Sequence, residues 1–162
     1  MSAAYRIVDE PRSRTQLPAF NPFWPLLAMM FGGAWLGVLM FAFNSWSLRS
    51  PTLKREMALA LAIVLGSPLL LLLLAMLPSL GLLPDSGIKY ALLVIVVWKL
   101  GLAYWILFLQ QNPYALFEYF EERAAGTSRS AQAGALVVVL GGLIKTNVVG
   151  AIDSPFWAVM VN

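Results

Sequence analysis

The sequence predicts an all-α integral membrane protein with four transmembrane helices and one short interfacial amphipathic helix. The 162 residues are 60% hydrophobic and only 12% charged, with a mean hydropathy of +0.76. Globular domains are about 45–50% apolar and about 25% charged. The segment 88–110 is apolar almost throughout, and as a helix it would rise about 34 Å, enough to cross a hydrocarbon core of about 30 Å.

The residue types that are missing exclude several classes of function. The chain has no cysteine and no histidine, which removes thiolate and imidazole metal ligands and the commonest general base. We therefore expect no enzymatic activity, no cofactor and no metal site. The net charge of +3 is thinly spread and predicts no nucleic-acid partner. The first twenty residues contain no apolar run, so we expect no cleavable signal peptide.

The chain divides into a polar N-terminal tail, residues 1–19, and a single transmembrane domain, residues 20–162. We predict spans at about 22–46, 57–77, 88–110 and 134–153. Pro22 suits the first turn of a helix, and Trp24 and Trp46 suit the two ends of a span. Pro68 should kink the second span.

Three of the predicted spans carry small residues at intervals of four, a spacing that lets a second helix approach closely. These candidate packing residues are Gly33 and Gly37 in the first span, Ala58, Ala62 and Gly66 in the second, and Gly142, Thr146 and Gly150 in the fourth.

The interfacial helix is predicted at about 113–125. Asn112 is a favourable N-cap and Pro113 a favourable first residue, and the segment places Phe117 and Phe120 opposite a face of glutamates. This helix is either a connector or a docking helix for a partner.

Four spans place both termini on the same side of the membrane. One side then carries five basic residues and the other four, so the positive-inside rule hardly distinguishes the two possible orientations. If the glycine-rich first segment were re-entrant, the count would become eight against one. Such a loop needs protein around it to satisfy its backbone. Four spans are the main prediction, and the re-entrant segment is the alternative.

Lys99 and Lys145 lie near the middle of the third and fourth spans, at similar predicted depth. A lysine at the helix centre costs about 2.5–3.5 kcal/mol, and such residues usually face a cavity or a partner. Since no acidic residue lies deep in a predicted span, the lysines meet backbone carbonyls, water, an anion or an acid of another protein, or else they snorkel or stay neutral. Asn44 and Asn147 are predicted to form hydrogen bonds between helices.

The segment Phe31-Gly32-Gly33-Ala34, followed by Asn44 to Arg49 and a basic connector into a Leu/Ala-rich span, resembles small four-span bacterial membrane proteins of unassigned function. Those proteins typically show Gly-Pro-Leu-Ala-Gly and then Asn-Tyr-Arg, whereas this chain lacks the proline and has Asn44-Ser45-Trp46. The resemblance covers about the first 80 residues. It implies a multi-pass protein of the bacterial inner membrane and no particular activity.

The leading functional hypothesis is a non-catalytic accessory or scaffold subunit of a larger membrane complex, with the lipid bilayer and other membrane subunits as partners. The alternative is a small oligomeric channel or carrier in which Lys99 and Lys145 line an anion path.

Overall fold

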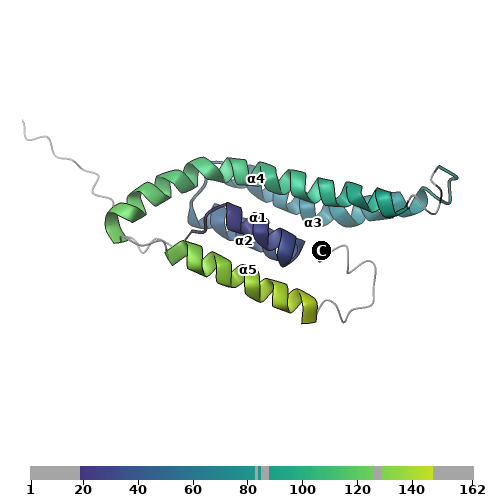
Figure 1. Cartoon of the computed structure of the whole chain (residues 1–162). Coiled ribbons are helices and arrows are strands. Elements are labelled where there is room, and N and C mark those ends of the chain that lie inside the picture. Colours follow the sequence, from purple (N-terminus) through teal and green to yellow (C-terminus); the bar gives the residue numbers. More distant parts are fainter. Residues whose placement is uncertain (1–18, 83, 85–87, 126–128, 148–162) are drawn as a thin grey trace, which may run out of the picture.

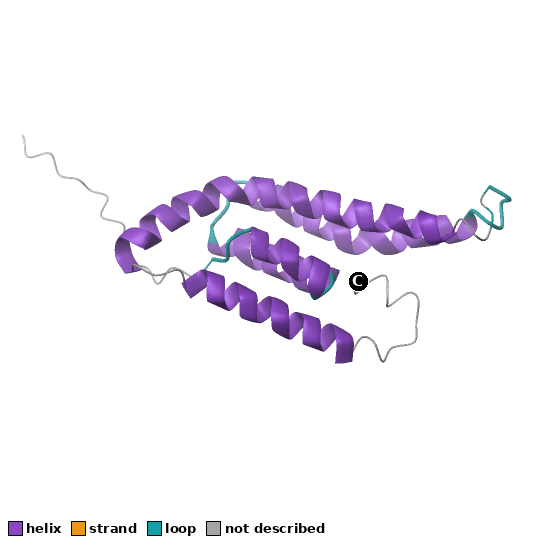
Figure 2. Cartoon of the chain, viewed as in Figure 1, coloured by secondary structure: helices purple, strands orange, loops and turns teal. Residues whose placement is uncertain are grey.

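The computed structural model describes residues 19–82, 84, 88–125 and 129–147, and these residues form five helices and no strand (Figures 1 and 2). The helices are α1 (Phe23–Phe31), α2 (Ala34–Ser47), α3 (Leu53–Met76), α4 (Ile88–Ala125) and α5 (Arg129–Asn147). The all-α prediction is therefore confirmed for the described part of the chain. The predicted tail, residues 1–19, lies almost wholly outside it.

The prediction of one span over 22–46 is wrong, because the segment forms two short antiparallel helices. Gly33 adopts φ 97°, a backbone conformation that side chains other than glycine rarely take, and the chain reverses between α1 and α2. At the other end of the pair, the amide of Phe20 donates to Asn44 Oδ1 at 2.8 Å, and Asn44 Nδ2 donates to the Phe20 carbonyl at 2.7 Å. The pair, residues 20–47, thus enters and leaves at the same end; we call it the hairpin.

Among the described residues, two helices are long and apolar enough to cross a membrane. They are α3 and the part of α4 from Leu92 to Tyr119. Within their most apolar stretches only 17% and 28% of the residues are buried by the rest of the chain. The core helix of a soluble protein would be mostly buried, so this exposure favours an apolar surrounding. The predicted second span, 57–77, matches α3 except that it runs one residue past the end of the helix, and the predicted third span, 88–110, lies within α4.

The predicted separate interfacial helix is also wrong as an independent element. Helix α4 continues through Pro113 to Ala125, so residues 113–125 are its C-terminal third. Proline lacks the amide hydrogen and its ring clashes with the preceding turn, so inside a helix it either kinks or breaks the helix, and here the helix continues. Tyr114, directly after the proline, is buried, and Figure 1 shows the end of α4 curving toward α5.

The fourth predicted span, 134–153, is described only as far as Asn147. The apolar part of α5, Gln132–Asn147, is shorter than the two long helices, and the remaining predicted residues lie outside the described range. By length and composition the described chain therefore contains two candidate spans and not four.

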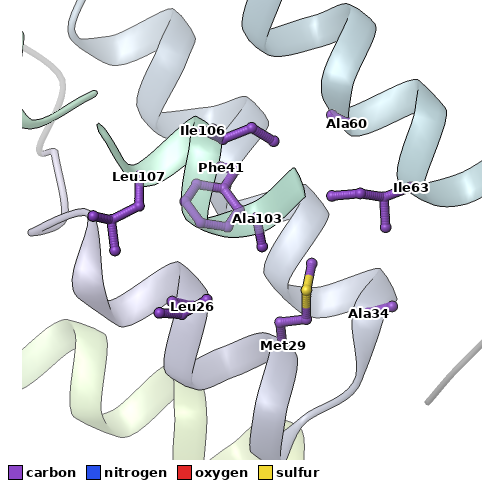
Figure 3. Packing of buried hydrophobic residues seen from close by; sticks show 9 residues of the cluster. All are labelled: Leu26, Met29, Ala34, Phe41, Ala60, Ile63, Ala103, Ile106 and Leu107. Atoms are coloured by element: carbon purple, nitrogen blue, oxygen red, sulfur yellow. The ribbon is translucent and has the colours of Figure 1, made fainter. Parts of the chain in front are cut away.

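The hairpin lies between the α3–α4 pair on one side and α5 on the other (Figure 1). Its inner face packs on a core cluster of Leu26, Met29, Ala34, Phe41, Ala60, Ile63, Ala103, Ile106 and Leu107, which gather around Phe41 in Figure 3. Four helices supply these side chains. At 1.5 Å per residue, α1 and α2 are only about 14 Å and about 21 Å long, so neither crosses a bilayer alone.

Cysteines at Asn21 and Arg49 should react with a membrane-impermeant thiol reagent from the same side of the membrane. These exposed positions lie at the two ends of the hairpin, and the chain has no cysteine of its own. A cysteine at Ser79, in the exposed turn after α3, should react from the opposite side and serves as the control. Labelling of positions 21 and 49 from opposite sides would restore the single first span.

Candidate functional site

Six polar residues meet at the base of the hairpin, where α2 ends and α3 begins. We call them the polar cluster: Asn44 and Ser45 of α2, Ser50 and Thr52 of the connector, Glu56 of α3 and Gln110 of α4. All except Thr52 are buried, at 5% exposure or less. Buried polar groups are tolerated where they are hydrogen-bonded to one another, and this set is.

The connector is shaped so that its hydroxyls face α3. Helix α2 ends at Ser47; two residues later Arg49 adopts φ 47°, and the amides of Arg49 and Ser50 donate to the carbonyls of Trp46 and Ser45. This is a Schellman motif, which reverses the chain after a helix. It brings Ser50 and Thr52 next to Glu56, one turn into α3.

Glu56 is the centre of the polar cluster. Its Oε2 atom lies 2.5 Å from Ser45 Oγ and 2.9 Å from Gln110 Nε2. Its Oε1 atom accepts from Ser50 Oγ and lies 2.6 Å from Thr52 Oγ1. One carboxyl group therefore holds together the end of α2, the connector, α3 and α4.

Gln110 extends the polar cluster into α4. Its Nε2 atom lies 3.0 Å from the Phe41 carbonyl and 2.9 Å from Ser45 Oγ. Its Oε1 atom faces Asn44 Nδ2 at 3.4 Å. Since Asn44 also bonds Phe20, the network reaches both chain segments at the base of the hairpin.

The sequence predicted only one member of this cluster. Asn44 does form the hydrogen bonds between helices expected of it. Glu56 was missed because it precedes the predicted second span by one residue, and Gln110 because it ends the predicted third span. The available signal was Ser50-Thr52-Glu56, three polar residues before an otherwise apolar run.

Lys99 is buried at 5% exposure, and Lys145 is half-buried. Lys145 of α5 is close enough to exert Coulombic repulsion on Lys99 of α4. Ala103, one turn from Lys99, belongs to the same core cluster as Ala34, and Gly141, one turn from Lys145, packs on Gly32. The two lysines thus lie near the tip of the hairpin, at the end opposite the polar cluster.

The small residues of the first two predicted spans serve packing within the chain. A Cβ added at Gly37 would stand 2.5 Å from Met29 Cβ, so this glycine lets α1 and α2 meet. Gly33 makes the reversal itself. Gly66 lies against the ring of Trp98, whose Nε1 donates to the Ala62 carbonyl at 3.3 Å. Ala58, by contrast, is exposed.

The remaining candidates contribute less. Gly142 is half-buried, and Thr146 and Asn147 are exposed and donate to the Leu143 carbonyl of their own helix, so no hydrogen bond between helices is seen for Asn147. Gly150 lies outside the described residues. Phe117 is half-buried with its ring 6.2 Å from that of Tyr114, and Phe120 is in α4, its side chain outside the described set.

No protein-family model, no curated protein and no solved structure matches this chain. The resemblance to small four-span bacterial membrane proteins therefore stays a prediction. What the site can do is argued from its own geometry.

Gln110→Ala should lower the free energy of unfolding by about 1–3 kcal/mol, because buried acceptors on Phe41 and Glu56 lose their donor. Thermal unfolding in detergent measures the change. Gln111→Ala, on the exposed face of the same turn, is the matched control and should change stability by about 0.5 kcal/mol or less. Equal effects of the two substitutions would contradict a holding role for the polar cluster.

Proposed function

We propose that the chain is a multi-pass integral membrane protein, of the bacterial inner membrane, that acts as a non-catalytic accessory or scaffold subunit of a larger membrane complex. In this arrangement α3 and α4 span the bilayer, the predicted fourth span (134–153), of which α5 contains the described part, crosses it a third time, and the hairpin is re-entrant. The observation that carries the proposal is the outward surface of α3 and α4, which stays apolar and exposed after the chain has packed on itself.

The basic residues support this arrangement. A re-entrant hairpin puts the N-terminal tail on the same side as the connector and as residues 112–133. That side then carries eight lysines and arginines and the other side one, Lys89. Such a bias is the usual mark of the cytoplasmic side.

The exposed surface also supports a role in assembly. The outward residues of α4 include Trp105, Phe108 and Tyr104, and the rings of Tyr104 and Phe108 contact edge to face at 5.1 Å. Large aromatic side chains are the residues most enriched at the centres of interfaces. The interior of the bundle, in contrast, is filled by the core cluster.

The accessory role predicts that the protein purified from its native membrane in a mild detergent brings other membrane subunits with it. Mass spectrometry of the intact assembly identifies them. Tyr104→Ala together with Phe108→Ala should reduce their recovery, because both rings lie on the outward face. Leu65→Ala, exposed on α3, is the control for loss of an apolar side chain. Recovery of this chain alone, as a homo-oligomer, would contradict the accessory role.

A channel or carrier is the second candidate, and the burial of Lys99 close to Lys145 favours it. Interrupted helices and buried charges within a membrane protein commonly mark the path of an ion or substrate. The burial of Lys99 in its own bundle also argues against a direct contact with an acid of another subunit, one of the alternatives that the sequence left open.

If the lysines line an anion path, Lys99→Leu should reduce chloride flux into proteoliposomes at least tenfold, because it removes the charge that stabilises the anion near the tip. Lys54→Leu, an exposed position at the start of α3, should leave the flux unchanged. Unchanged flux in the Lys99 variant, with correct insertion, would exclude the path.

A further inference from the structure

The polar cluster contains more oxygen–oxygen contacts than hydroxyl protons. Ser45, Ser50 and Thr52 supply one proton each. Five contacts at hydrogen-bond distance require them: Ser45 with the Phe41 carbonyl and with Glu56, Ser50 with Thr52 and with Glu56, and Thr52 with Glu56. If Glu56 is ionised, three protons serve five contacts; a proton on Glu56 makes four, and the one shared hydrogen that then remains lies in the triangle of Ser50, Thr52 and Glu56.

Ser45 shows the shortage most directly. Its Oγ lies 2.9 Å from the Phe41 carbonyl oxygen and 2.5 Å from Glu56 Oε2. Neither a carbonyl nor an ionised carboxylate can donate, so one serine proton would have to serve two acceptors. A proton on Glu56 Oε2 resolves the conflict, because Glu56 then donates to Ser45 and Ser45 donates to Phe41.

Gln110 cannot supply the missing proton. Its two amide hydrogens already face three acceptors, on Phe41, Ser45 and Glu56. The opposite orientation of the amide would turn its oxygen toward those acceptors and its nitrogen toward Asn44 Nδ2, so the hydrogen-bond network fixes the orientation described.

The charged surroundings do not balance an ionised Glu56 either. The four donors to Glu56 favour its ionised form and together outweigh burial, which favours the neutral form, so it is the shortage of hydroxyl protons and not burial that favours a bound proton. Glu56 is 1% exposed, and the packed helices α2 and α4 face it with the neutral Ser45 and Gln110. The basic residues nearest to it in sequence, Arg49, Lys54 and Arg55, are exposed to solvent.

We propose that Glu56 is a proton-binding site at the base of the hairpin. The bound proton completes the chain of hydrogen bonds from Glu56 through Ser45 to Phe41, and so joins α3 to α2. When this proton is lost, Ser45 can donate to only one of its two neighbours, the Phe41 carbonyl or Glu56, and its lone pairs face those of the other. The attachment of the hairpin is then weaker. Protonation of Glu56 thereby controls how firmly the hairpin is held.

The test is carbon-13 NMR of the full chain in detergent, with the glutamate carboxyl carbons labelled. At neutral pH we expect one signal at the position of a protonated carboxyl and the signals of the other glutamates at the ionised position. The protonated signal should vanish in Glu56→Gln and persist in Glu118→Gln, the exposed control on α4. A spectrum in which every glutamate is ionised at neutral pH overturns the proposal. This outcome can be observed with the wild-type chain alone.

Thermal unfolding between neutral and alkaline pH gives a second, independent reading. Glutamine resembles a protonated glutamate in shape and also donates, so Glu56→Gln should keep the neutral-pH Tm and lose the fall in Tm that the wild type shows as pH rises. A lower Tm for Glu56→Gln at neutral pH, with an unchanged dependence on pH, would overturn the proposal. So would a Glu56 signal that moves to the ionised position when sodium chloride replaces choline chloride, because a sodium ion would then be the occupant.

Discussion

The structure depends on one backbone constraint, the reversal at Gly33 in the middle of an apolar segment. A reversal breaks the helical ladder and leaves amide and carbonyl groups that lipid cannot satisfy. In the proposed membrane setting such a break is tolerated only where protein surrounds it. The other helices provide this surrounding, with α3 and α4 on one side of the hairpin and α5 on the other.

The two ends of the hairpin are held by different means. At the tip, glycines remove the side chains that would keep helices apart, so Gly32 and Gly141 bring α1 and α5 into backbone contact. At the base, hydrogen bonds from Asn44, Ser45 and Gln110 fix the chain where it enters and leaves. Packing in an apolar medium offers little selectivity between alternative arrangements, whereas buried hydrogen bonds require matched partners. The polar cluster therefore sets the position of the hairpin, and the core cluster around Phe41 fills the space that this position leaves.

The parts of the fold that follow from hydropathy could be predicted from the sequence, and the parts that depend on contacts between helices could not. Helices α3 and α4 are visible as long apolar runs. The reversal at Gly33 is not, because the same glycines suit an unbroken span packed against a neighbour; the charge count was the one sequence observation that favoured the re-entrant form. Pro113 predicted a new helix by its preference for a first turn, but α4 continues through it, and Tyr114 directly after it is buried. Glu56 and Gln110 were overlooked because a polar residue at the edge of an apolar run resembles the end of a span.

The distribution of polar groups along the hairpin relates its structure to its use. The base carries a carboxyl and its hydrogen-bond partners, the tip lies near two lysines, and the length between them is apolar. A hairpin that served only to fill space would gain nothing from Lys99, since leucine at that position would avoid the cost of burying an amine. A hairpin that moved freely would gain nothing from Glu56, since the polar cluster restrains it. The polar cluster thus holds the base of the hairpin in place, and Lys99 and Lys145 lie near its tip. The position of the hairpin therefore determines what surrounds these two lysines.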